Sequence, residues 1–330
     1  MSDVQYPKGA IKCLDKGFIR LVDSMGSDGA IVQAARVSYG KGTTKVSRDK
    51  GLIRYLLRHR HSTPFEMVEL KFHAKMPIFV ARQWVRHRTA NINEYSLRYS
   101  EALQDFYIPK KKDIHFQSQF NKQGRDDKKV PPELKEKVIN YFNEISEKTF
   151  AIYDELNEAG IARELARGIL PVNLFTEWYW KNDLHNIFHF LRLRMDEHAQ
   201  YEIRVFAEAM ASFVKKVVPI AYEAFEDYSI NGMYFSKLER DLLKTRFPDR
   251  IINDLKDEVT YKIVASINEN KNRNGEELYQ LYQENGGIDC KDDFNIKWKA
   301  GNIETDNVFE MREFLLKLEE LKKIATNARI

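Results

Sequence analysis

Residues 18–22 form a short, mainly apolar run, and apolar and polar residues alternate in two further segments, residues 67–76 and 93–100. Such alternation predicts β-strands that have one buried face. The third segment places Tyr95, Leu97 and Tyr99 on one side and Glu94, Ser96 and Arg98 on the other. A polar row of this kind is either solvated or lines a pocket.

Helical repeats lie between these segments. Residues 29–40, 52–59 and 79–88 repeat apolar positions every three or four residues, which predicts helices. Thr63 and Glu66 have the spacing of a capping box, which predicts that a further element begins at Thr63. The first hundred residues therefore mix strands and helices, as in an α/β fold.

Longer helices are predicted downstream. Residues 110–130 are highly charged and predict an exposed loop, after which two prolines open an amphipathic helix that ends at Gly160. Its apolar positions are Leu134, Val138, Phe142, Ile145, Ile152 and Leu156. A short helix is expected over residues 162–170, and the longest helical pattern runs from Leu184 to Val217.

A boundary is predicted near residue 230, because the composition then shifts toward Asn, Lys and Glu. A chain of 330 residues is also long enough for two units. We therefore expect a domain over residues 1–230 and a charged, mainly helical extension over residues 231–330. Its last helix has apolar positions suited to packing rather than to a coiled coil: Met311, Phe314, Leu315, Leu318 and Leu321.

The composition favours a soluble, cytoplasmic protein. Hydrophobic residues make up 43% of the chain, enough for a sizeable core. No apolar run of about 18 residues and no signal-peptide core occur, so neither a membrane span nor secretion is expected. Cys13 and Cys290 are too few for a disulfide framework or a four-thiolate metal site.

The net charge of +4 is small, but the charge is unevenly distributed. Residues 231–330 carry 17 basic and 19 acidic residues, so the excess of positive charge lies in residues 1–230. Arginines are concentrated in one stretch: Arg54, Arg58, Arg60, Arg82, Arg86, Arg88 and Arg98. This predicts an anionic partner, either nucleic acid or a phosphorylated small molecule.

Two features of the helix from Leu184 suggest chemistry. Arg194 projects at the edge of the apolar face formed by Leu184, Ile187 and Leu191. Burial of an arginine is costly unless an anion meets it, so Arg194 either pairs with a core carboxylate or points into a ligand site. His185 and His189 are four residues apart, which is a weak indication of metal, and we predict no metal site.

A second group of candidates is the run Arg86-His87-Arg88 with the segment Asn93–Tyr99. Arginine forks suit phosphate oxygens and the edges of planar heterocycles. Ser96 has no nucleophile elbow around it, so a hydrogen-bonding role is expected. The chain has neither a dinucleotide-binding glycine fingerprint nor a P-loop.

Arg86-His87-Arg88, seven residues and then Ser96 reproduce the RHR-x7-S motif of flavin-dependent thymidylate synthases. The surrounding blocks also resemble this family, in order over about residues 10–230: HSTPFE, PIFVARQWVRHR, NEYSLRY, LPVNLFTEWYW and FLRLRMDEHAQYEI. The resemblance implies a central mixed or antiparallel sheet flanked by long helices. It also implies a homotetramer with active sites shared between subunits, and no nucleic-acid or membrane partner.

The resemblance further implies reductive methylation of dUMP to dTMP, with 5,10-methylenetetrahydrofolate as carbon donor, FAD as cofactor and NADPH as reductant. Arg194, Ser96 and His61 match catalytic positions, and Arg194 matches the arginine that promotes ionisation of uracil N3. Positions that match dUMP contacts are Gln83, Arg86, Glu94, Tyr95, Ser96, Leu97, Arg98, Arg167 and Arg194. Positions that match FAD contacts are Ser38, Thr63, Arg86, His87, Arg88, Glu94, Asp183, Leu184, His185 and His189.

Departures from the family pattern are local, apart from the extension. Asn91 stands where longer versions of the motif have serine, and His185 and His189 stand where some members have arginine and asparagine. Residues 231–330 lie beyond the usual end of the family. Neither cysteine lies in an electropositive stretch, so a mechanism without a protein nucleophile is expected.

Two other functions remain as alternatives. The arginine-rich stretch could serve a nucleic-acid-binding module, but the slightly acidic extension provides no continuing basic face. A non-catalytic nucleotide-binding homologue would be expected to lack Arg194 or Ser96, and both are present.

Overall fold

The computed structural model describes residues 6–37, 46–119, 124–246, 249–268, 273–287, 289, 291 and 311–318. The chain divides into two compact units, Met1–Gly232 and Met233–Ile330. Three residues named above, Ser38, Cys290 and Leu321, lie outside the described ranges.

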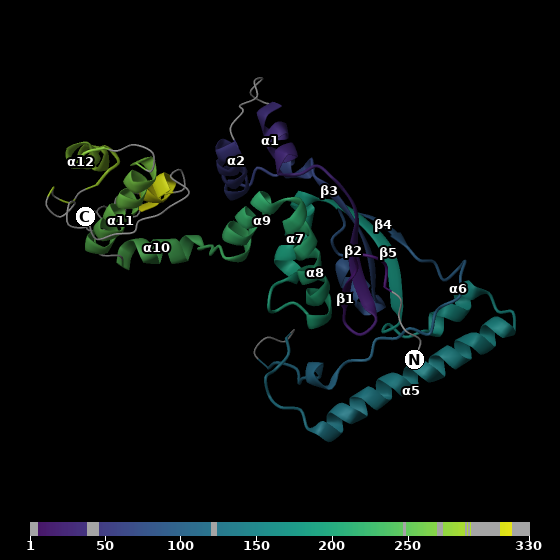
Figure 1. Ribbon diagram of the computed structural model, residues 1–330. Coiled ribbons are helices and arrows are strands. Elements are labelled where there is room, and N and C mark those ends of the chain that lie inside the picture. The colour runs from purple at the N-terminus through teal and green to yellow at the C-terminus, as the bar shows by residue number, and fades with distance from the viewer. Residues whose placement is uncertain are drawn as a thin grey trace. The chain divides into compact units, whose positions relative to one another are not determined.

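A five-stranded antiparallel sheet forms the centre of the first unit (Figure 1). Its strands, in spatial order, are β1 (Ile11–Cys13), β2 (Gly17–Met25), β3 (Glu69–Pro77), β5 (Phe175–Asp183) and β4 (Asn91–Glu94). Leu70, Phe72, Ala74 and Met76 of β3 are fully buried, as the alternation in residues 67–76 predicts. Gly17 is required where β1, β2 and β3 meet, because a Cβ there would lie 2.7 Å from Cys13 O and 2.8 Å from Lys75 O.

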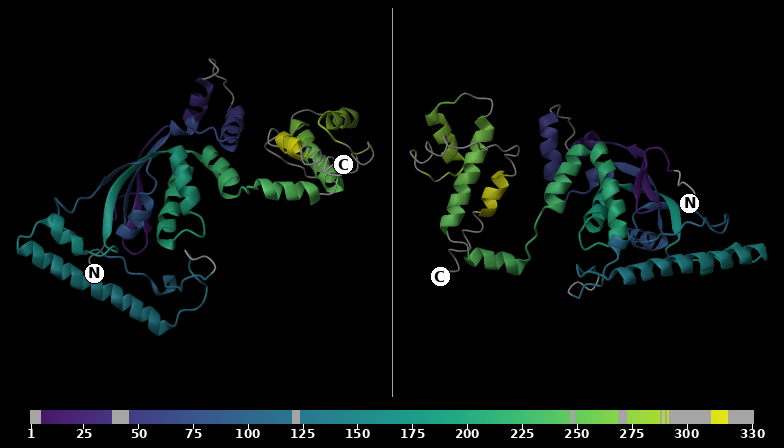
Figure 2. Two further views of the ribbon diagram at one scale, coloured as in Figure 1. Left: turned by 180° about the vertical axis from the view of Figure 1, so that it is seen from behind. Right: turned by 60° about the horizontal axis from the view of Figure 1, so that its bottom comes forward.

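Helices pack on this sheet and supply most of the core. They are α1 (Asp28–Val37), α2 (Val46–Arg58), α3 (Thr63–Glu66), α4 (Ile78–Trp84), α7 (Leu184–Arg194), α8 (Tyr201–Val217) and α9 (Pro219–Phe225). Figures 1 and 2 show α7 and α8 side by side next to the sheet. Trp84 at the end of α4 is fully buried against Trp178, Trp180 and Phe190, so it anchors α4 to both β5 and α7.

The long helix α5 (Pro132–Glu158) contacts α6 (Arg163–Ala166) and the 3-10 turns Lys111–Asp113 and Arg167–Ile169. Its prolines lie at the helix start, as predicted. Half of the predicted apolar positions are nevertheless exposed in the single chain. Leu134, Tyr141, Ile145 and Ile152 are each at least 40% exposed and lie on one stripe of the helix.

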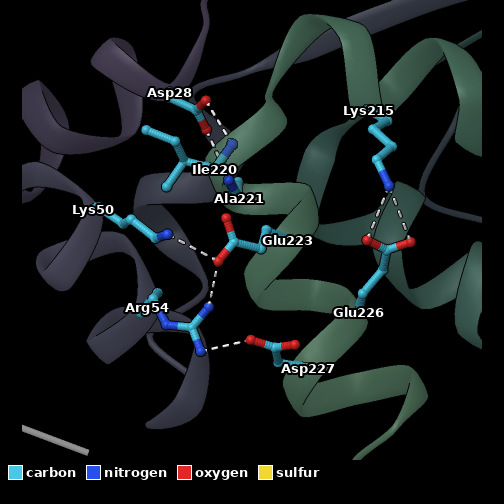
Figure 3. Close-up of polar contacts among 9 residues, drawn as sticks. All are labelled: Asp28, Lys50, Arg54, Lys215, Ile220, Ala221, Glu223, Glu226 and Asp227. Carbon is cyan, nitrogen blue, oxygen red and sulfur yellow. Dashed lines mark hydrogen bonds and ion pairs between the residues drawn. The ribbon is translucent and has the colours of Figure 1, made fainter. Parts of the chain in front are cut away.

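A polar network joins the N-terminal helices to the end of the first unit (Figure 3). The Asp28 carboxylate accepts the backbone N–H groups of Ile220 and Ala221 at 3.0 and 2.9 Å. These amides lie in the first turn of α9, where backbone donors have no partner within the helix. Arg54 of α2 pairs with Glu223 at 3.1 Å and with Asp227 of the π-helical turn Glu226–Ile230 at 2.6 Å. Asp28 thus caps α9 rather than its own helix.

The second unit is helical where it is described. It contains α10 (Lys237–Arg246), α11 (Asp249–Asn268) and α12 (Gly275–Glu284), and residues 311–318 are also helical. Tyr261 and Val264 pack against Leu278 and Tyr282. Leu315 is buried with Val259 and Ile263, whereas Phe314 is 38% exposed. The sequence pattern did not predict α11, because its buried residues are spread among charged ones.

Three element predictions were wrong in detail. β4 ends at Glu94, because Ser96 starts a turn: its Oγ accepts the Arg98 N–H at 3.3 Å and its carbonyl accepts the Tyr99 N–H at 3.2 Å. The helix expected from Leu184 to Val217 is two helices. Asp196 Oδ1 accepts the His198 N–H at 2.8 Å, and such a local bond competes with the helical ladder.

Helix α3 begins at Thr63, as predicted, but the capping box is absent. The N-cap of α3 is Ser62, which has helical dihedral angles and makes no side-chain capping bond. Strand β5 was not predicted as a strand, because its sequence FTEWYWKND has Glu between the aromatic residues and Lys, Asn and Asp after them.

Candidate active site

The first unit contains two pockets that hold most of the predicted site residues. The first pocket has a volume of about 560 Å³. Its lining residues come from the segment after α4 and from α7: Arg86, His87, Arg88, Thr89, Asn186, His189, Leu193 and Arg194. Arg86 and Arg88 are exposed and form no ion pair with a described carboxylate, so both guanidinium groups are available to a ligand.

Arg194, the last residue of α7, is half-buried in the wall of this pocket. Its Nε donates to His87 Nε2 at 3.1 Å, and its Nη2 donates to the Gln83 carbonyl at 3.3 Å. Neither partner is an anion, and no described carboxylate pairs with Arg194. Burial lowers the pKa of Arg194. Of the two possibilities left by the sequence, pairing with a core carboxylate is thus excluded for the described residues.

His87 orients this arginine as a neutral ring. Burial, together with the charge of Arg194 and the neighbouring His189, lowers the pKa of His87 to about 4. Because Nε2 accepts from Arg194, the proton of the neutral ring lies on Nδ1. The His87 ring also packs edge-on against Phe190, with ring centroids 4.9 Å apart. The guanidinium is therefore held by an uncharged acceptor that does not neutralise it.

The second pocket, of about 500 Å³, lies between strands β3 and β5 and the turn at Ser96. Its polar lining is Lys75, Glu94, Tyr95, Ser96, Asp105, Glu164, Arg167, Thr176 and Glu177, and Leu97 and Phe175 are among its apolar residues. Glu94 accepts a hydrogen bond from Thr176 Oγ1 at 2.6 Å, and the Tyr95 N–H donates to the Glu177 carbonyl at 2.8 Å. These bonds fix the Ser96 turn against β5.

Ion pairs order the wall of the second pocket. Lys75 donates to Asp105 at 2.5 Å, and Lys16 lies 3.5 Å from the same carboxylate. Burial alone would raise the pKa of Asp105, but its bonds to Lys75 and Lys16 hold that pKa below its usual value. Glu177 pairs with the buried His73, whose Nδ1 accepts from Arg20 at 3.0 Å. Both carboxylates are therefore fixed in place.

The structure divides the predicted dUMP contacts between the two pockets. Arg86 and Arg194 line the first, and Glu94, Tyr95, Ser96, Leu97 and Arg167 line the second. Gln83 lies next to Arg194 through its carbonyl. Arg98 is exposed and pairs with Glu164 at 3.0 Å. One chain therefore does not bring all these residues to a single cavity.

The predicted FAD contacts are divided as well. Arg86, His87, Arg88 and His189 line the first pocket, and Glu94 lines the second. Asp183 caps α7 by accepting the Asn186 N–H at 2.9 Å. His185 and Thr63 are exposed, whereas the side chain of Leu184 is fully buried in the core. His61 is exposed and stacks on Tyr55, with ring centroids 6.0 Å apart.

Several residues that line the two pockets were not predicted from the sequence. Thr89, Asn186 and Leu193 join the first pocket, and Lys75, Asp105 and Glu177 join the second. Thr89 and Asn186 could have been found from their nearness to Arg88 and His185. The three residues of the second pocket give no sequence signal. The pairing of β3 with β5 brings Lys75 and Glu177 together, and Asp105 joins them through its ion pair with Lys75.

Three further features of the described residues concern metal ligands, membrane-spanning helices and the Cys13 thiol. Within the described residues, no three His, Cys, Asp or Glu side chains gather as metal ligands would. No described helix is both long and apolar enough to span a membrane. Cys13 is buried, and burial raises its pKa to about 12, so its thiolate is not available at neutral pH.

Comparisons with known proteins identify the family of this chain. Residues 20–220 match the family described as thymidylate synthase complementing protein. The flavin-dependent thymidylate synthase of Rickettsia conorii is 51% identical over 284 residues, which cover 82% of this chain and 93% of that protein. This share exceeds the first unit, so the similarity extends into the second unit.

The flavin-dependent thymidylate synthase of Treponema denticola is 55% identical over 233 residues, covering 71% of this chain and 88% of that protein. Among solved structures, the UMP/dUMP methylase PolB from Streptomyces cacaoi bound with 5-Br dUMP superposes with a TM-score of 0.60 at 33% identity, covering 66% of this chain and 98% of that chain. The motif, the fold and these similarities together show that the chain belongs to the family of flavin-dependent thymidylate synthases.

Proposed function

We propose that this chain converts dUMP to dTMP, taking the carbon from 5,10-methylenetetrahydrofolate with FAD as cofactor and NADPH as reductant. Residues 1–230 are proposed as the catalytic domain. The observation that carries the proposal is the half-buried guanidinium of Arg194, which lines a pocket and has no described carboxylate as partner. A guanidinium held in place without a counter-ion stabilises a transition state most where negative charge develops during the reaction.

The role assigned to Arg194 follows from this geometry. Uracil becomes nucleophilic as it gains negative charge, and a guanidinium at the imide stabilises that charge. The neutral His87 ring holds Nε of Arg194 without neutralising it, and the Gln83 carbonyl holds Nη2. Arg86, Arg167 and Arg98 supply cationic donors for the nucleotide, and Glu94, Tyr95, Ser96, Leu97 and Gln83 complete its contacts.

The residues of the first pocket fit a flavin nucleotide. Arg86, Arg88 and His189 are donors with no described carboxylate among the lining residues, which suits a pyrophosphate. We assign FAD binding to these residues together with His87, Glu94, Asp183, Leu184, His185, Thr63 and Ser38. FAD supplies the reducing hydride when bound, and the exposed His61 is assigned to the region of flavin and folate.

The proposed reaction uses no protein nucleophile. Cys13 is buried with a raised pKa. Ser96 Oγ accepts the Arg98 N–H at 3.3 Å, and no described carboxylate or histidine bonds to it as a general base would. Ser96 is therefore assigned to binding and positioning of the nucleotide.

We further propose a cytoplasmic homotetramer with active sites shared between subunits. Two observations support sharing. The predicted dUMP contacts lie in two separate pockets of one chain, and a second copy could place its Ser96 turn over the Arg194 pocket. In addition, the exposed apolar stripe of α5 is suited to contact with another copy.

The test is the visible absorption spectrum of the purified protein, followed by anaerobic NADPH with and without dUMP, and then an assay of dTMP. Flavin bands that NADPH bleaches at a dUMP-dependent rate, together with dTMP formation, are the expected result. A protein that binds no flavin after addition of FAD, or that binds flavin and dUMP but forms no dTMP, would overturn the proposal. The first outcome would favour a binding module, and the second a non-catalytic homologue.

A further inference from the structure

Glu202, near the start of α8, is a buried acceptor that the proposed reaction does not use. Its side chain is only 5% exposed. Oε1 accepts from Tyr107 Oη at 3.1 Å and from Arg125 Nη2 at 2.6 Å, and Oε2 accepts from Gln200 Nε2 at 2.9 Å. These three donors, one of which is the cationic Arg125, hold the Glu202 side chain in a fixed position.

Gln200 connects this carboxylate to the proposed active site. Its Oε1 accepts a hydrogen bond from Nε2 of Gln83, which lies in the last turn of α4. The Gln83 carbonyl in turn accepts from Arg194. A chain of hydrogen bonds thus runs from Glu202 through Gln200 to Gln83, beside the guanidinium assigned to uracil.

The direction of these hydrogen bonds follows from which groups can donate and which can accept. A carboxylate only accepts, so Gln200 must turn its NH₂ group toward Glu202. The Gln200 oxygen then faces Gln83, so Gln83 must turn its own NH₂ group toward Gln200. The remaining atom, Gln83 Oε1, is an acceptor that no described residue donates to.

We propose that Glu202 is a positioning residue that acts through Gln200 to fix the Gln83 amide, so that Gln83 presents its oxygen to a hydrogen-bond donor of the nucleotide. The inference rests on the proposed function and adds a specificity determinant to it. The arginines assigned to the nucleotide can only donate. Gln83 supplies the acceptor that they lack, for an N–H or O–H of the ligand, which dUMP offers at uracil N3 and at the 3′-hydroxyl.

The experiment measures the dUMP dissociation constant of the FAD-loaded enzyme by titration calorimetry. The variants are Gln200→Met, Gln83→Met and the double variant, and melting temperatures check that each folds. Each single change is expected to weaken dUMP binding about five- to tenfold, the effect of one neutral hydrogen bond. The double variant should be no weaker than Gln83→Met alone, because both changes remove the same contact.

Tyr107→Phe is the matched control. It removes one hydrogen bond from Oε1 of Glu202 and leaves the bond from Gln200 to Oε2, so dUMP affinity should stay within about twofold. Additive losses of dUMP affinity in the double variant would overturn the proposal that Glu202 acts through Gln200 on Gln83. Equal losses of affinity in Tyr107→Phe and Gln200→Met would also overturn it, and would indicate general disruption of α8.

Two analogues then identify the donor of the ligand. N3-methyl-dUMP lacks the imide proton, and 3′-deoxy-dUMP lacks the hydroxyl. One analogue should bind more weakly than dUMP to the parent enzyme but as well as dUMP to Gln83→Met. The group missing from that analogue is the donor to Gln83, and the proposal is supported whichever analogue it is. If neither loss changes, Gln83 Oε1 faces no donor of dUMP and the proposal fails. Failure of the parent enzyme to bind dUMP at all would instead count against the proposed function.

Discussion

The two pockets of the first unit differ in the charges that line them. The lining of the first contains three arginines, two histidines and no described carboxylate. The lining of the second contains four carboxylates with one lysine and one arginine: Glu94, Asp105, Glu164, Glu177, Lys75 and Arg167. The first pocket therefore carries unbalanced positive charge, whereas the lining of the second contains groups of both signs, with twice as many carboxylates as cations.

This difference has a structural cause. Arg194 lies at the C-terminal end of α7, where the helix dipole favours a cation, and its other stabilisation comes from the neutral His87 and a backbone carbonyl. Lys75 and Glu177 instead lie on paired strands, where Asp105 and His73 meet them directly. The first pocket is therefore suited to negatively charged groups of a ligand, and the second to a ligand with both hydrogen-bond donors and acceptors.

The largest effect is expected from Arg194→Lys in the first pocket. A lysine keeps the charge but loses the planar fork held by His87 and Gln83. We expect dTMP formation to fall about a hundred- to a thousandfold in kcat, with a smaller change in dUMP affinity, because the charge acts mainly in the transition state. Arg192→Lys, an exposed position on the same helix, is the control. Equal losses of kcat in the two variants would contradict the role proposed for Arg194 in the first pocket.

The next largest effect is expected from Arg167→Ala in the second pocket. Loss of a charged hydrogen bond should raise the dUMP dissociation constant about ten- to a hundredfold and leave the flavin content unchanged. Arg163→Ala on the neighbouring helix α6 is the control, because Arg163 bonds to Glu101 and the Tyr99 carbonyl and does not line the pocket. Loss of flavin in Arg167→Ala would show that the pockets do not divide the two ligands.

A pH effect on stability is expected from His87 in the first pocket. The folded-state pKa of His87 is about 4, below its ordinary value of 6.5, so the unfolded chain binds more protons between these values. The neutral His87 therefore lowers stability progressively as the pH falls from about 6.5 to about 4. His87→Gln keeps an acceptor for Arg194 and does not titrate, so its melting temperature should fall less than that of the parent over this range. Parallel melting curves for the two proteins would contradict the assignment.

The smallest effect on either pocket is expected from Asp28→Ala. This change removes the cap of α9 and should cost about 1 kcal/mol in the free energy of unfolding, which lowers the melting temperature by about 2–4 °C. Flavin content and dUMP affinity should not change. Lys215→Ala breaks the exposed pair with Glu226 (Figure 3) and removes the ammonium from over the Tyr222 ring, and should cost less stability than the loss of the cap. A loss of dUMP affinity in Asp28→Ala would show that this network also shapes the pockets.

Local patterns along the chain were sufficient for several elements and for the family. The alternation around Phe72 predicted β3, the prolines before Glu133 predicted the start of α5, and the RHR-x7-S motif predicted the flavin and dUMP chemistry. These features depend on residues close in sequence, through backbone preference, periodic burial and short spacing. They failed where local side-chain bonds interrupted the pattern, as at Ser96 and Asp196.

The sequence by itself therefore determined the family, most elements of the catalytic unit and the residue types that meet anions. Only the tertiary structure decided that Arg194 pairs with His87 rather than with a carboxylate, that the predicted contacts divide between two pockets, and that Gln200 joins Glu202 to Gln83. The partners in each of these bonds are separated by many residues: 107 between His87 and Arg194, and 117 between Gln83 and Gln200. The packing of α4, α7 and α8 around the buried Trp84 brings them together, and no pattern within a single segment contains that information.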